Sequence, residues 1–172
     1  VAENIKKPER ISVMSPDLSG MNRARLFRNI LASIFTAKRI LPADFEIPLC
    51  VLDKTHVGRT IQGHMVVGDV KDRDVVIVDD MIASAKTMSE ARKGVMANGG
   101  RVWGACATHG LFVGRANENL ADFERVIVTD TVRPYRLTGP AASRLAVIST
   151  AKLFAEAIKR INEEDSISDL LS

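Results

Sequence analysis

Two adjacent carboxylates, Asp79 and Asp80, follow the apolar run VVIV. The next residues, MIASAKT, are mostly small or hydroxylated and lead into a helical pattern. Free backbone N–H groups and the helix dipole attract an anion at the start of a helix, and Ser84 and Thr87 would add hydroxyl donors. Carboxylates beside such an anion cradle suit a ligand that also carries hydroxyl groups or a hydrated Mg²⁺. The pattern therefore predicts a sugar-phosphate site in which the aspartates accept hydrogen bonds from vicinal hydroxyls or from metal-bound water.

A purely structural interpretation of the same doublet is also open. Asp79 can begin a turn and Asp80 can cap a helix without binding any ligand. Joints that run from a strand through an aspartate to a helix are common in alternating folds, and short motifs produce false matches. The doublet alone fits both interpretations, so the rest of the chain has to separate them.

The elements that position the doublet follow from apolar periodicity. Apolar runs predict strands at residues 11–15, 47–53, 65–70, 75–80, 101–108 and 125–130. Apolar spacings of three and four residues predict helices at about 21–41, 88–97 and 150–162. The segment KTHVGRTIQGH, residues 54–64, is rich in glycine and charge and predicts a mobile loop.

This alternation of strands and helices predicts the fold class. Several strands are continuous apolar runs, which indicates an α/β fold with a mostly parallel sheet flanked by helices on both faces. In such sheets ligands bind outside the carboxyl ends of the strands, where Asp79 and Asp80 lie. A chain of 172 residues, 46% of them hydrophobic, is long enough for one full core, so residues 1–172 are expected to form a single domain.

Composition argues against several classes of function. The 24 basic and 21 acidic residues leave a net charge of +3 and are scattered along the chain, which disfavours nucleic-acid binding. No apolar run approaches the ~18 residues of a membrane span, and the first residues, VAENIKKPER, do not resemble a signal peptide. Cys50 and Cys106 lie in separate apolar runs, as reduced core thiols do. A cytoplasmic protein that binds no membrane is therefore expected.

Several segments, in order, resemble those of ribose-phosphate pyrophosphokinases within the type I phosphoribosyltransferases. VVIVDDMIASAKT resembles the phosphoribosyl pyrophosphate motif, SPDLSGMNRAR the pyrophosphate loop and LDKTH the start of the catalytic flexible loop. VVGDV, ATHGLF and VTDT resemble further family segments, and AEAIKRINEEDSISDLL resembles the C-terminal signature. The resemblance covers nearly the whole chain and implies the C-terminal half of the family's architecture, without the N-terminal half that recognises ATP.

The resemblance implies a chemistry and a role for each matching residue. Ribose 5-phosphate would attack the β-phosphorus of Mg-ATP through its anomeric hydroxyl, giving phosphoribosyl pyrophosphate and AMP. The implied ribose-phosphate ligands are Asp79, Asp80, Ser84, Ala85, Lys86 and Thr87. The implied diphosphate ligands are Asp17, Ser19 and Gly20, with Mg²⁺ on Asp17, and the implied catalytic cations are Lys54 and Arg59. The implied macromolecular partner is a second copy of the chain or an N-terminal-half domain.

Three positions depart from the family pattern. Ala83 stands where many members have an acid, His56 where they have arginine and Lys86 where they have glycine. His56 is a weaker cation than arginine at neutral pH, although Arg59 lies close by in the sequence. Lys86 is expected either to strain the phosphate loop, at a cost of about 1–3 kcal/mol, or to point its ammonium at the phosphate.

Three alternative functions remain open from the sequence. A phosphoribosyltransferase would consume phosphoribosyl pyrophosphate with a nucleobase and would need a hood for that base, for which only residues 1–10 and 133–145 are available. A noncatalytic, synthetase-associated protein would keep the fold and regulate a partner, consistent with the altered phosphate loop. A receiver-like signalling domain also uses an acidic doublet, but places it after an earlier strand.

Overall fold

The computed structural model describes residues 2–57 and 60–170, without the side chains of residues 54–64. The strands are β1 (Ile11–Ser15), β2 (Leu49–Val57), β3 (Thr60–Val67), β4 (Asp74–Ile82), β5 (Arg101–Gly110), β6 (Val126–Thr129) and β7 (Leu145–Ile148). The helices are α1 (Met21–Ala37), α2 (Lys86–Ala97), α3 (Ala116–Leu120), α4 (Gly139–Ser143) and α5 (Ala151–Asn162). Short 3-10 turns are η1 (Ala2–Asn4), η2 (Pro8–Arg10) and η3 (Ser168–Leu170).

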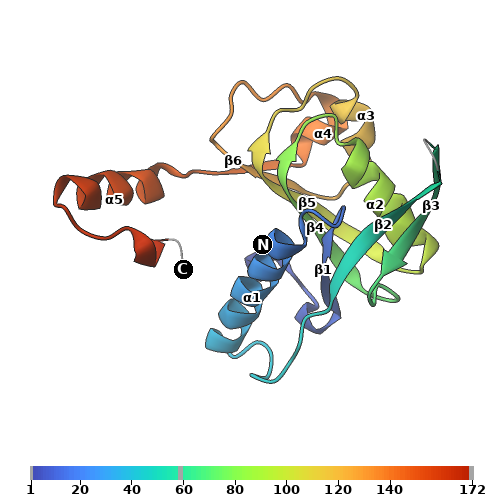
Figure 1. Cartoon of the computed structure of the whole chain (residues 1–172), viewed down its shortest axis with the longest axis horizontal. Helices are drawn as coiled ribbons and strands as arrows, with labels where there is room; N and C mark the ends of the chain where they lie inside the picture. The colour runs from blue at the N-terminus through green and yellow to red at the C-terminus, as the bar shows by residue number, and fades with distance from the viewer. Residues whose placement is uncertain (1, 58–59, 171–172) are drawn as a thin grey trace.

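The strands form a seven-stranded sheet in the order β3-β2-β1-β4-β5-β6-β7 (Figure 1). Every neighbouring pair is parallel except β2 and β3, which are antiparallel. Helix α1 covers one face of the sheet, and α2, α3 and α4 cover the other. The predicted α/β fold, a mostly parallel sheet flanked by helices, is therefore confirmed.

Strand β4 shows why its sequence is a continuous apolar run. Val75 and Ile77 pack into the core on the side of α2, whereas Val76 and Val78 pack into the core on the side of α1. Successive side chains of a strand point to opposite faces, so a strand covered on both faces needs apolar residues at every position. This strand carries the aspartate doublet at its carboxyl end.

Helix α1 ends earlier than predicted. Its last helical residue is Ala37, because Arg39 adopts a left-handed backbone conformation with φ of 54°. The N–H of Ile40 donates to the carbonyl of Phe35 at 2.8 Å, and the N–H of Arg39 donates to the carbonyl of Thr36 at 2.9 Å. These two bonds form a Schellman motif, which satisfies the last carbonyls and stops the helix.

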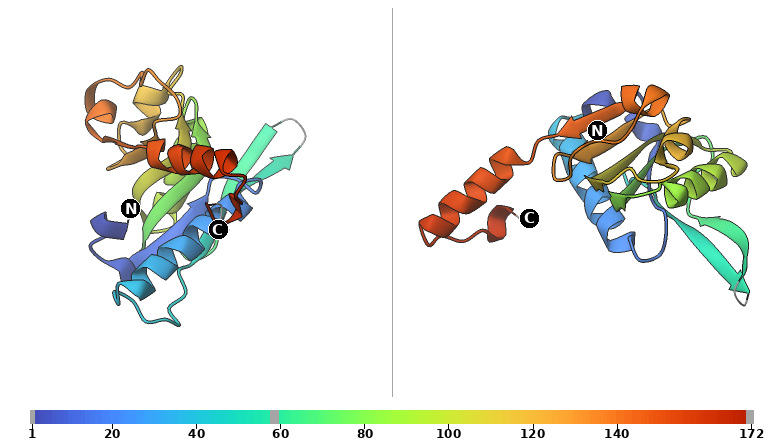
Figure 2. Two further views of the ribbon diagram at one scale, coloured as in Figure 1. Left: turned by 90° about the vertical axis from the view of Figure 1, so that its left-hand side faces the viewer. Right: turned by 90° about the horizontal axis from the view of Figure 1, so that it is seen from above.

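The prediction of a loop at residues 54–64 is wrong. Strand β2 continues to Val57, β3 begins at Thr60, and the backbone pairs Lys54 with His64 and Thr55 with Gly63. Figure 2 shows this hairpin projecting beyond the rest of the sheet. Strand pairing satisfies backbone hydrogen bonds without a core on both sides, so polar and glycine residues do not prevent it.

Helix α5 forms where predicted but does not join the core. Its apolar residues Leu153, Phe154, Ile158 and Ile161 are 50%, 55%, 67% and 63% exposed. Figure 1 shows α5 extending away from the sheet after β7. Strand β7 and the short helices α3 and α4, of four or five residues each, were not predicted. Among the described residues, no helix is long and apolar enough to span a bilayer.

Candidate functional site

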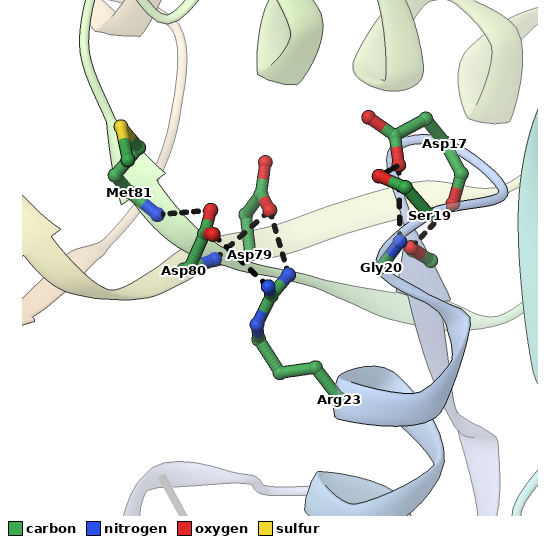
Figure 3. Close-up of polar contacts among 8 residues, drawn as sticks. Asp17, Ser19, Gly20, Arg23, Asp79, Asp80 and Met81 are labelled. Atoms are coloured by element: carbon green, nitrogen blue, oxygen red, sulfur yellow. Dashed lines mark hydrogen bonds and ion pairs between the residues drawn. The ribbon is translucent and has the colours of Figure 1, made fainter.

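The candidate site lies at one edge of the sheet, where two loops leave parallel neighbouring strands. β1 and β4 are hydrogen-bonded to each other in parallel, so their carboxyl ends meet at the same edge. The loop after β1 leads into α1, and the loop after β4 leads into α2. Asp17 and Gly20 come from the first loop, and Asp79 and Asp80 come from the end of β4 (Figure 3). The structure thus brings together residues about 60 positions apart, as the topology of parallel sheets requires.

The first loop is built around Asp17. Its carboxylate Oδ1 accepts hydrogen bonds from the Ser19 hydroxyl at 2.6 Å and from the Gly20 N–H at 3.1 Å. The Ser15 hydroxyl donates to the Asp17 carbonyl at 2.7 Å. A Cβ at Gly20 would lie 2.6 Å from Ser15 Oγ and 3.2 Å from Arg23 Nη1. A Cβ at position 20 would therefore displace the Ser15 hydroxyl and crowd the Arg23 guanidinium, so glycine preserves the hydrogen bonds of this loop.

Arg23 joins the first loop to the aspartate doublet. Its Nη1 lies 3.0 Å from Asp79 Oδ1, and its Nη2 lies 3.0 Å from Asp80 Oδ2. Figure 3 shows the guanidinium pointing from the first turn of α1 toward both carboxylates. Sequence analysis did not single out Arg23. Its position three residues after Gly20, on the first turn of a helix that follows the loop, was the available signal.

Asp79 and Asp80 occupy different environments. The Asp79 side chain is 17% exposed and that of Asp80 is 48% exposed. Burial is the main cause that raises the pKa of Asp79 to about 6, the negative charge of Asp80 adds to the rise, and Arg23 opposes it. The Asp79 Oδ1 also accepts the N–H of Asp80 at 2.9 Å, and the Asp80 Oδ1 accepts the N–H of Met81 at 2.8 Å. The doublet is thus held by the backbone as well as by Arg23.

The second loop encloses a small cavity at the start of α2. Ala85 precedes the helix with a left-handed φ of 57°, and the amide of Asn119 donates to the Ser84 carbonyl at 2.8 Å. The cavity has a volume of about 170 Å³ and is lined by Asp79, Met81, Ile82, Ala83, Ser84, Ala85, Lys86, Thr87 and Met88. A cavity of this size beside a helix N-terminus suits a single phosphate group better than a whole nucleotide.

The expectation of a strained Lys86 is not met. Lys86 is the first residue of α2, and the left-handed residue of the loop is Ala85. The Lys86 ammonium lies 3.8 Å from the Glu90 carboxylate one turn along the helix. That side chain is 74% exposed, so the ion pair is a weak surface interaction that a phosphate could replace.

The two predicted catalytic cations belong to the β2–β3 hairpin. The Lys54 backbone lies in β2, beyond Val51, which pairs with Ser15 at the end of β1. The hairpin therefore rises from the same sheet edge as the Asp17 loop. The side chains of Lys54 and His56 and the whole of Arg59 lie outside the described part of the chain.

The donor set fits a magnesium ion held mainly by its substrate. Among the side chains of residues 2–53 and 65–170, no group of three or more His, Cys, Asp or Glu is arranged to hold a metal. Mg²⁺ is commonly held by one or two carboxylates together with substrate phosphates and water, without a cage made of protein alone. A single carboxylate at Asp17, beside the doublet, is compatible with that mode.

An apolar cleft of about 290 Å³ adjoins the doublet on the α1 side of the sheet. Leu26, Phe27 and Ile30 of α1 form one wall, and Ile148 at the end of β7 lies on the other side. Leu26, Ile30 and Ile148 are 55%, 48% and 53% exposed. This cleft is an uncovered apolar surface beside the site, and α5 carries a second one away from the sheet.

Comparison with known proteins finds matches over nearly the whole chain. Residues 54–172 match the phosphoribosyl synthetase-associated domain family. The chain is 39% identical over 163 residues to a ribose-phosphate pyrophosphokinase of Gloeobacter violaceus, covering 92% of this chain and 44% of that protein. It is 34% identical over 169 residues to a ribose-phosphate pyrophosphokinase of Haemophilus ducreyi, covering 95% and 49%.

A solved structure agrees with the sequence matches. The crystal structure of phosphoribosylpyrophosphate synthetase from Mycobacterium smegmatis superposes with a TM-score of 0.71 at 27% identity. The alignment covers 92% of this chain and 47% of that one. The chain therefore spans about half the length of the relatives that it matches.

Proposed function

Because the chain belongs to the phosphoribosyl synthetase-associated domain family and is related to an enzyme family, the ribose-phosphate pyrophosphokinases, we propose that it supplies the ribose-phosphate and diphosphate loops of a ribose-phosphate diphosphokinase. The observation that carries this proposal is the meeting of the Asp17 loop, Arg23 and the aspartate doublet at one sheet edge. The reaction would transfer the diphosphoryl group of Mg-ATP to ribose 5-phosphate, giving phosphoribosyl pyrophosphate and AMP.

The doublet and the second loop would bind ribose 5-phosphate. Asp79 and Asp80 would accept hydrogen bonds from two vicinal ribose hydroxyls while Arg23 keeps both carboxylates in place. The 5-phosphate would lie in the cavity formed by residues 84–87, where the N-terminus of α2 attracts negative charge. Two contacts of opposite chemistry, acceptors for hydroxyls and donors for a phosphate, would fix the orientation of the sugar. Oriented binding of this kind lowers the entropic barrier to transfer.

The first loop would bind the diphosphate. Gly20 would let the backbone approach the diphosphate oxygens, and the Ser19 hydroxyl, which donates to Asp17 in the structure, would turn to donate to the diphosphate. Asp17 would hold Mg²⁺ together with those oxygens, and the ion would neutralise charge on the transferring group. Lys54 and Arg59, on the hairpin that rises from the same edge, would stabilise further negative charge in the transition state.

The second half of the catalytic unit would come from a partner domain. The relatives are about twice as long as this chain, so the occupant that we propose for the exposed apolar surfaces is a domain equivalent to their other half. Exposed apolar patches beside polar residues commonly mark interaction surfaces. The apolar cleft beside Asp79 and the uncovered face of α5 are such surfaces. The cleft directly adjoins the pair Asp79 and Asp80, which we call the ribose clamp.

A noncatalytic regulatory role is the second candidate. Ala83 removes an acid that many relatives carry, and Lys86 directs its ammonium toward Glu90. A chain with these changes could bind ribose 5-phosphate and regulate a synthetase partner without completing transfer. The catalytic and regulatory functions would use the same binding site, but only the catalytic one would convert ribose 5-phosphate to product.

Calorimetric binding of ribose 5-phosphate or phosphoribosyl pyrophosphate with Mg²⁺ tests the ribose clamp. The double variant Asp79→Asn with Asp80→Asn is expected to weaken binding by at least ~1.5 kcal/mol, the lower range for hydrogen bonds to charged groups. Asp44→Asn with Asp122→Asn changes the net charge equally at exposed positions and should leave the affinity unchanged. Equal affinities of the doublet variant and the parent would remove the ribose-clamp assignment.

A further inference from the structure

A second polar pocket lies at the sheet edge opposite the candidate site. Its volume is about 370 Å³, and its lining residues are Lys6, Lys7, Arg10, Asp74, Arg101, Trp103, Glu124 and Arg125. Asp74 and Arg101 are the first residues of β4 and β5, and Arg10 and Arg125 immediately precede β1 and β6. The pocket is therefore built at the amino ends of the parallel strands, whereas Asp79 and Asp80 lie at a carboxyl end. We call it the basal pocket.

The basal pocket carries an excess of positive charge. Five of its lining residues are cationic and two are acidic. Both acids bind the same guanidinium, because Arg101 Nε lies 2.7 Å from Asp74 Oδ1 and Arg101 Nη1 lies 2.8 Å from Glu124 Oε1. Within the described part of the chain, Lys6, Lys7, Arg10 and Arg125 have no carboxylate partner. Four cations that face one concave surface repel each other, so a bound anion would stabilise the arrangement.

A bulge in β5 holds one of these cations in place. Val75 pairs with Val102 and Val76 pairs with Gly104, so Trp103 is an extra residue in β5. Its side chain is only 4% exposed, and the Arg125 guanidinium carbon lies 5.5 Å from the centre of its ring. Bulges of this kind redirect a side chain, and cation–π stacking limits the motion of an arginine.

Gly104 in β5 has no side chain and therefore lets Arg125 lie close to the sheet. A Cβ at Gly104 would lie 2.9 Å from the Arg125 carbonyl oxygen and 3.1 Å from the Arg125 Cβ. The N–H of Ala105 donates to that carbonyl at 3.0 Å. On the other side of the pocket, Arg10 Nε donates to the Asp72 carbonyl at 2.8 Å. The backbone therefore positions two arginines, and Lys6 and Lys7 lie on an exposed segment beside them.

We propose that the basal pocket binds a small multivalent phosphate anion of the diphosphate class. Planar guanidinium groups bind phosphate oxygens with paired hydrogen bonds, and lysines add point charges. The volume lies within the range of about 300–1,000 Å³ that is typical of small-molecule sites, and the pocket is concave. The Trp103 ring is covered by Arg125, so the pocket offers no open aromatic face on which a nucleic-acid base could stack.

The single tryptophan of the chain provides a local reporter, because Trp103 lines this pocket and is remote from the aspartate doublet. The 172-residue chain is titrated with sodium diphosphate at constant ionic strength while Trp103 fluorescence and its indole N–H resonance are recorded. A saturable change is expected. Lys6→Ala with Lys7→Ala should weaken the response about tenfold or more, as expected for losing one or two hydrogen bonds from charged groups.

A matched control removes two lysines elsewhere. Lys152→Ala with Lys159→Ala removes the same charge from exposed positions of α5 and should leave the Trp103 response unchanged. Inorganic phosphate should bind more weakly than diphosphate because it carries less charge, and a nucleoside diphosphate should match diphosphate if the base makes no contact. Ribose 5-phosphate affinity should be equal in all these variants, which separates this pocket from the ribose clamp.

Three outcomes would overturn the basal-pocket proposal. The first is a Trp103 signal that does not saturate with diphosphate. The second is an unchanged diphosphate affinity in the Lys6→Ala/Lys7→Ala variant. The third is an equal loss of diphosphate affinity in the Lys152→Ala/Lys159→Ala control, which would show only general charge screening. Stronger binding of a single-stranded oligonucleotide than of diphosphate at equal phosphate concentration would instead assign the surface to nucleic acid.

Discussion

At the scale of single residues, the site depends on how Arg23 controls two neighbouring carboxylates. Adjacent carboxylates repel each other, and burial makes the charged form of Asp79 still less favourable. Arg23 binds both groups at 3.0 Å and keeps them aimed at the same side of the sheet edge. We therefore regard Arg23 as a positioning residue for the ribose clamp.

Replacing Arg23 tests this role. Arg23→Gln removes the cation that lowers the pKa of Asp79, so that pKa should rise further above about 6. Ribose 5-phosphate binding should then weaken roughly threefold to tenfold near pH 7 and recover near pH 9, where Asp79 is ionised again. Arg25→Gln, on the same helix, should change neither the affinity nor its pH dependence. Tighter binding of the Arg23→Gln variant at every pH would mean that Arg23 obstructs the clamp.

The raised pKa of Asp79 also predicts a pH dependence of stability. The folded protein holds the proton on Asp79 more tightly than the unfolded chain does, because its pKa rises from 3.8 to about 6. The resulting stabilisation is fully present below about pH 4 and is lost as the pH rises through about 6. In urea titrations, Asp79→Asn should remove this part of the decline in unfolding free energy, and Asp44→Asn should retain it. Parallel pH profiles for the Asp79→Asn variant and the parent would contradict the shift.

At the scale of elements, α5 is attached to the sheet mainly at its first residues. The Asp130 carboxylate, after β6, accepts hydrogen bonds from the Thr150 N–H at 2.8 Å, the Thr150 hydroxyl at 2.7 Å and the Ser149 hydroxyl at 2.8 Å. These hydrogen bonds lower the pKa of Asp130 to about 2. The helix beyond them has no buried residue, so its apolar face contributes little to the stability of the isolated chain.

A substitution on α5 should therefore impair binding of the partner domain without lowering the stability of the chain. Ile158→Asp is expected to change the unfolding free energy by less than about 0.5 kcal/mol, because Ile158 is 67% exposed. Ile77→Ala, in the buried strand β4, should cost about 2–5 kcal/mol in the same denaturation experiment. The Ile158→Asp chain should also fail to co-purify with a domain that corresponds to the other half of the relatives. If the Ile158→Asp chain co-purified as well as the parent, the partner domain would have to bind a different surface of the chain.

At the scale of the whole molecule, the proposed function gives the described elements one side of a transfer reaction. Diphosphoryl transfer needs the ATP triphosphate held in line with the ribose hydroxyl, and such alignment can lower a barrier by about 7–11 kcal/mol. The sheet edge offers the aspartate doublet, the cavity at the start of α2 and the Asp17 loop, which would hold the ribose, its 5-phosphate and the diphosphate. Recognition of the ATP base would fall to the partner domain.

An AMP-release assay tests whether the chain needs the partner domain for turnover. The 172-residue chain alone should make no detectable AMP from ribose 5-phosphate and Mg-ATP, and addition of the partner half should restore turnover. In the restored enzyme, Lys54→Ala should lower kcat more than it raises KM, because the charge that Lys54 meets develops toward the transition state. Lys152→Ala, on α5, serves as the lysine control. Robust turnover by the chain alone would refute the half-site model, and absence of turnover with the partner would favour the regulatory role.

Local sequence patterns predicted most of the long elements and the sheet edge at which the site lies. A continuous apolar run identified β4, and the spacing of Met88, Ala91 and Val95 identified α2, whose three apolar residues are all buried. The alternation of strands and helices was sufficient to predict a mostly parallel sheet. The family resemblance implied that the Asp17 loop and the doublet would serve one site, and the parallel pairing of β1 with β4 brings both to a common edge.

Only the tertiary structure decided which side chains complete the two sites. Arg23 reaches Asp79 across 56 positions of sequence, and the basal pocket gathers cations from the starts of β1, β5 and β6 and from the N-terminal segment. A Cβ at Gly20 would displace the Ser15 hydroxyl and crowd the Arg23 guanidinium, a contact that appears only in the folded chain. Likewise, periodicity predicted an amphipathic α5 but could not place it. Periodicity reports which residues share a face, whereas packing of the whole chain decides what that face contacts.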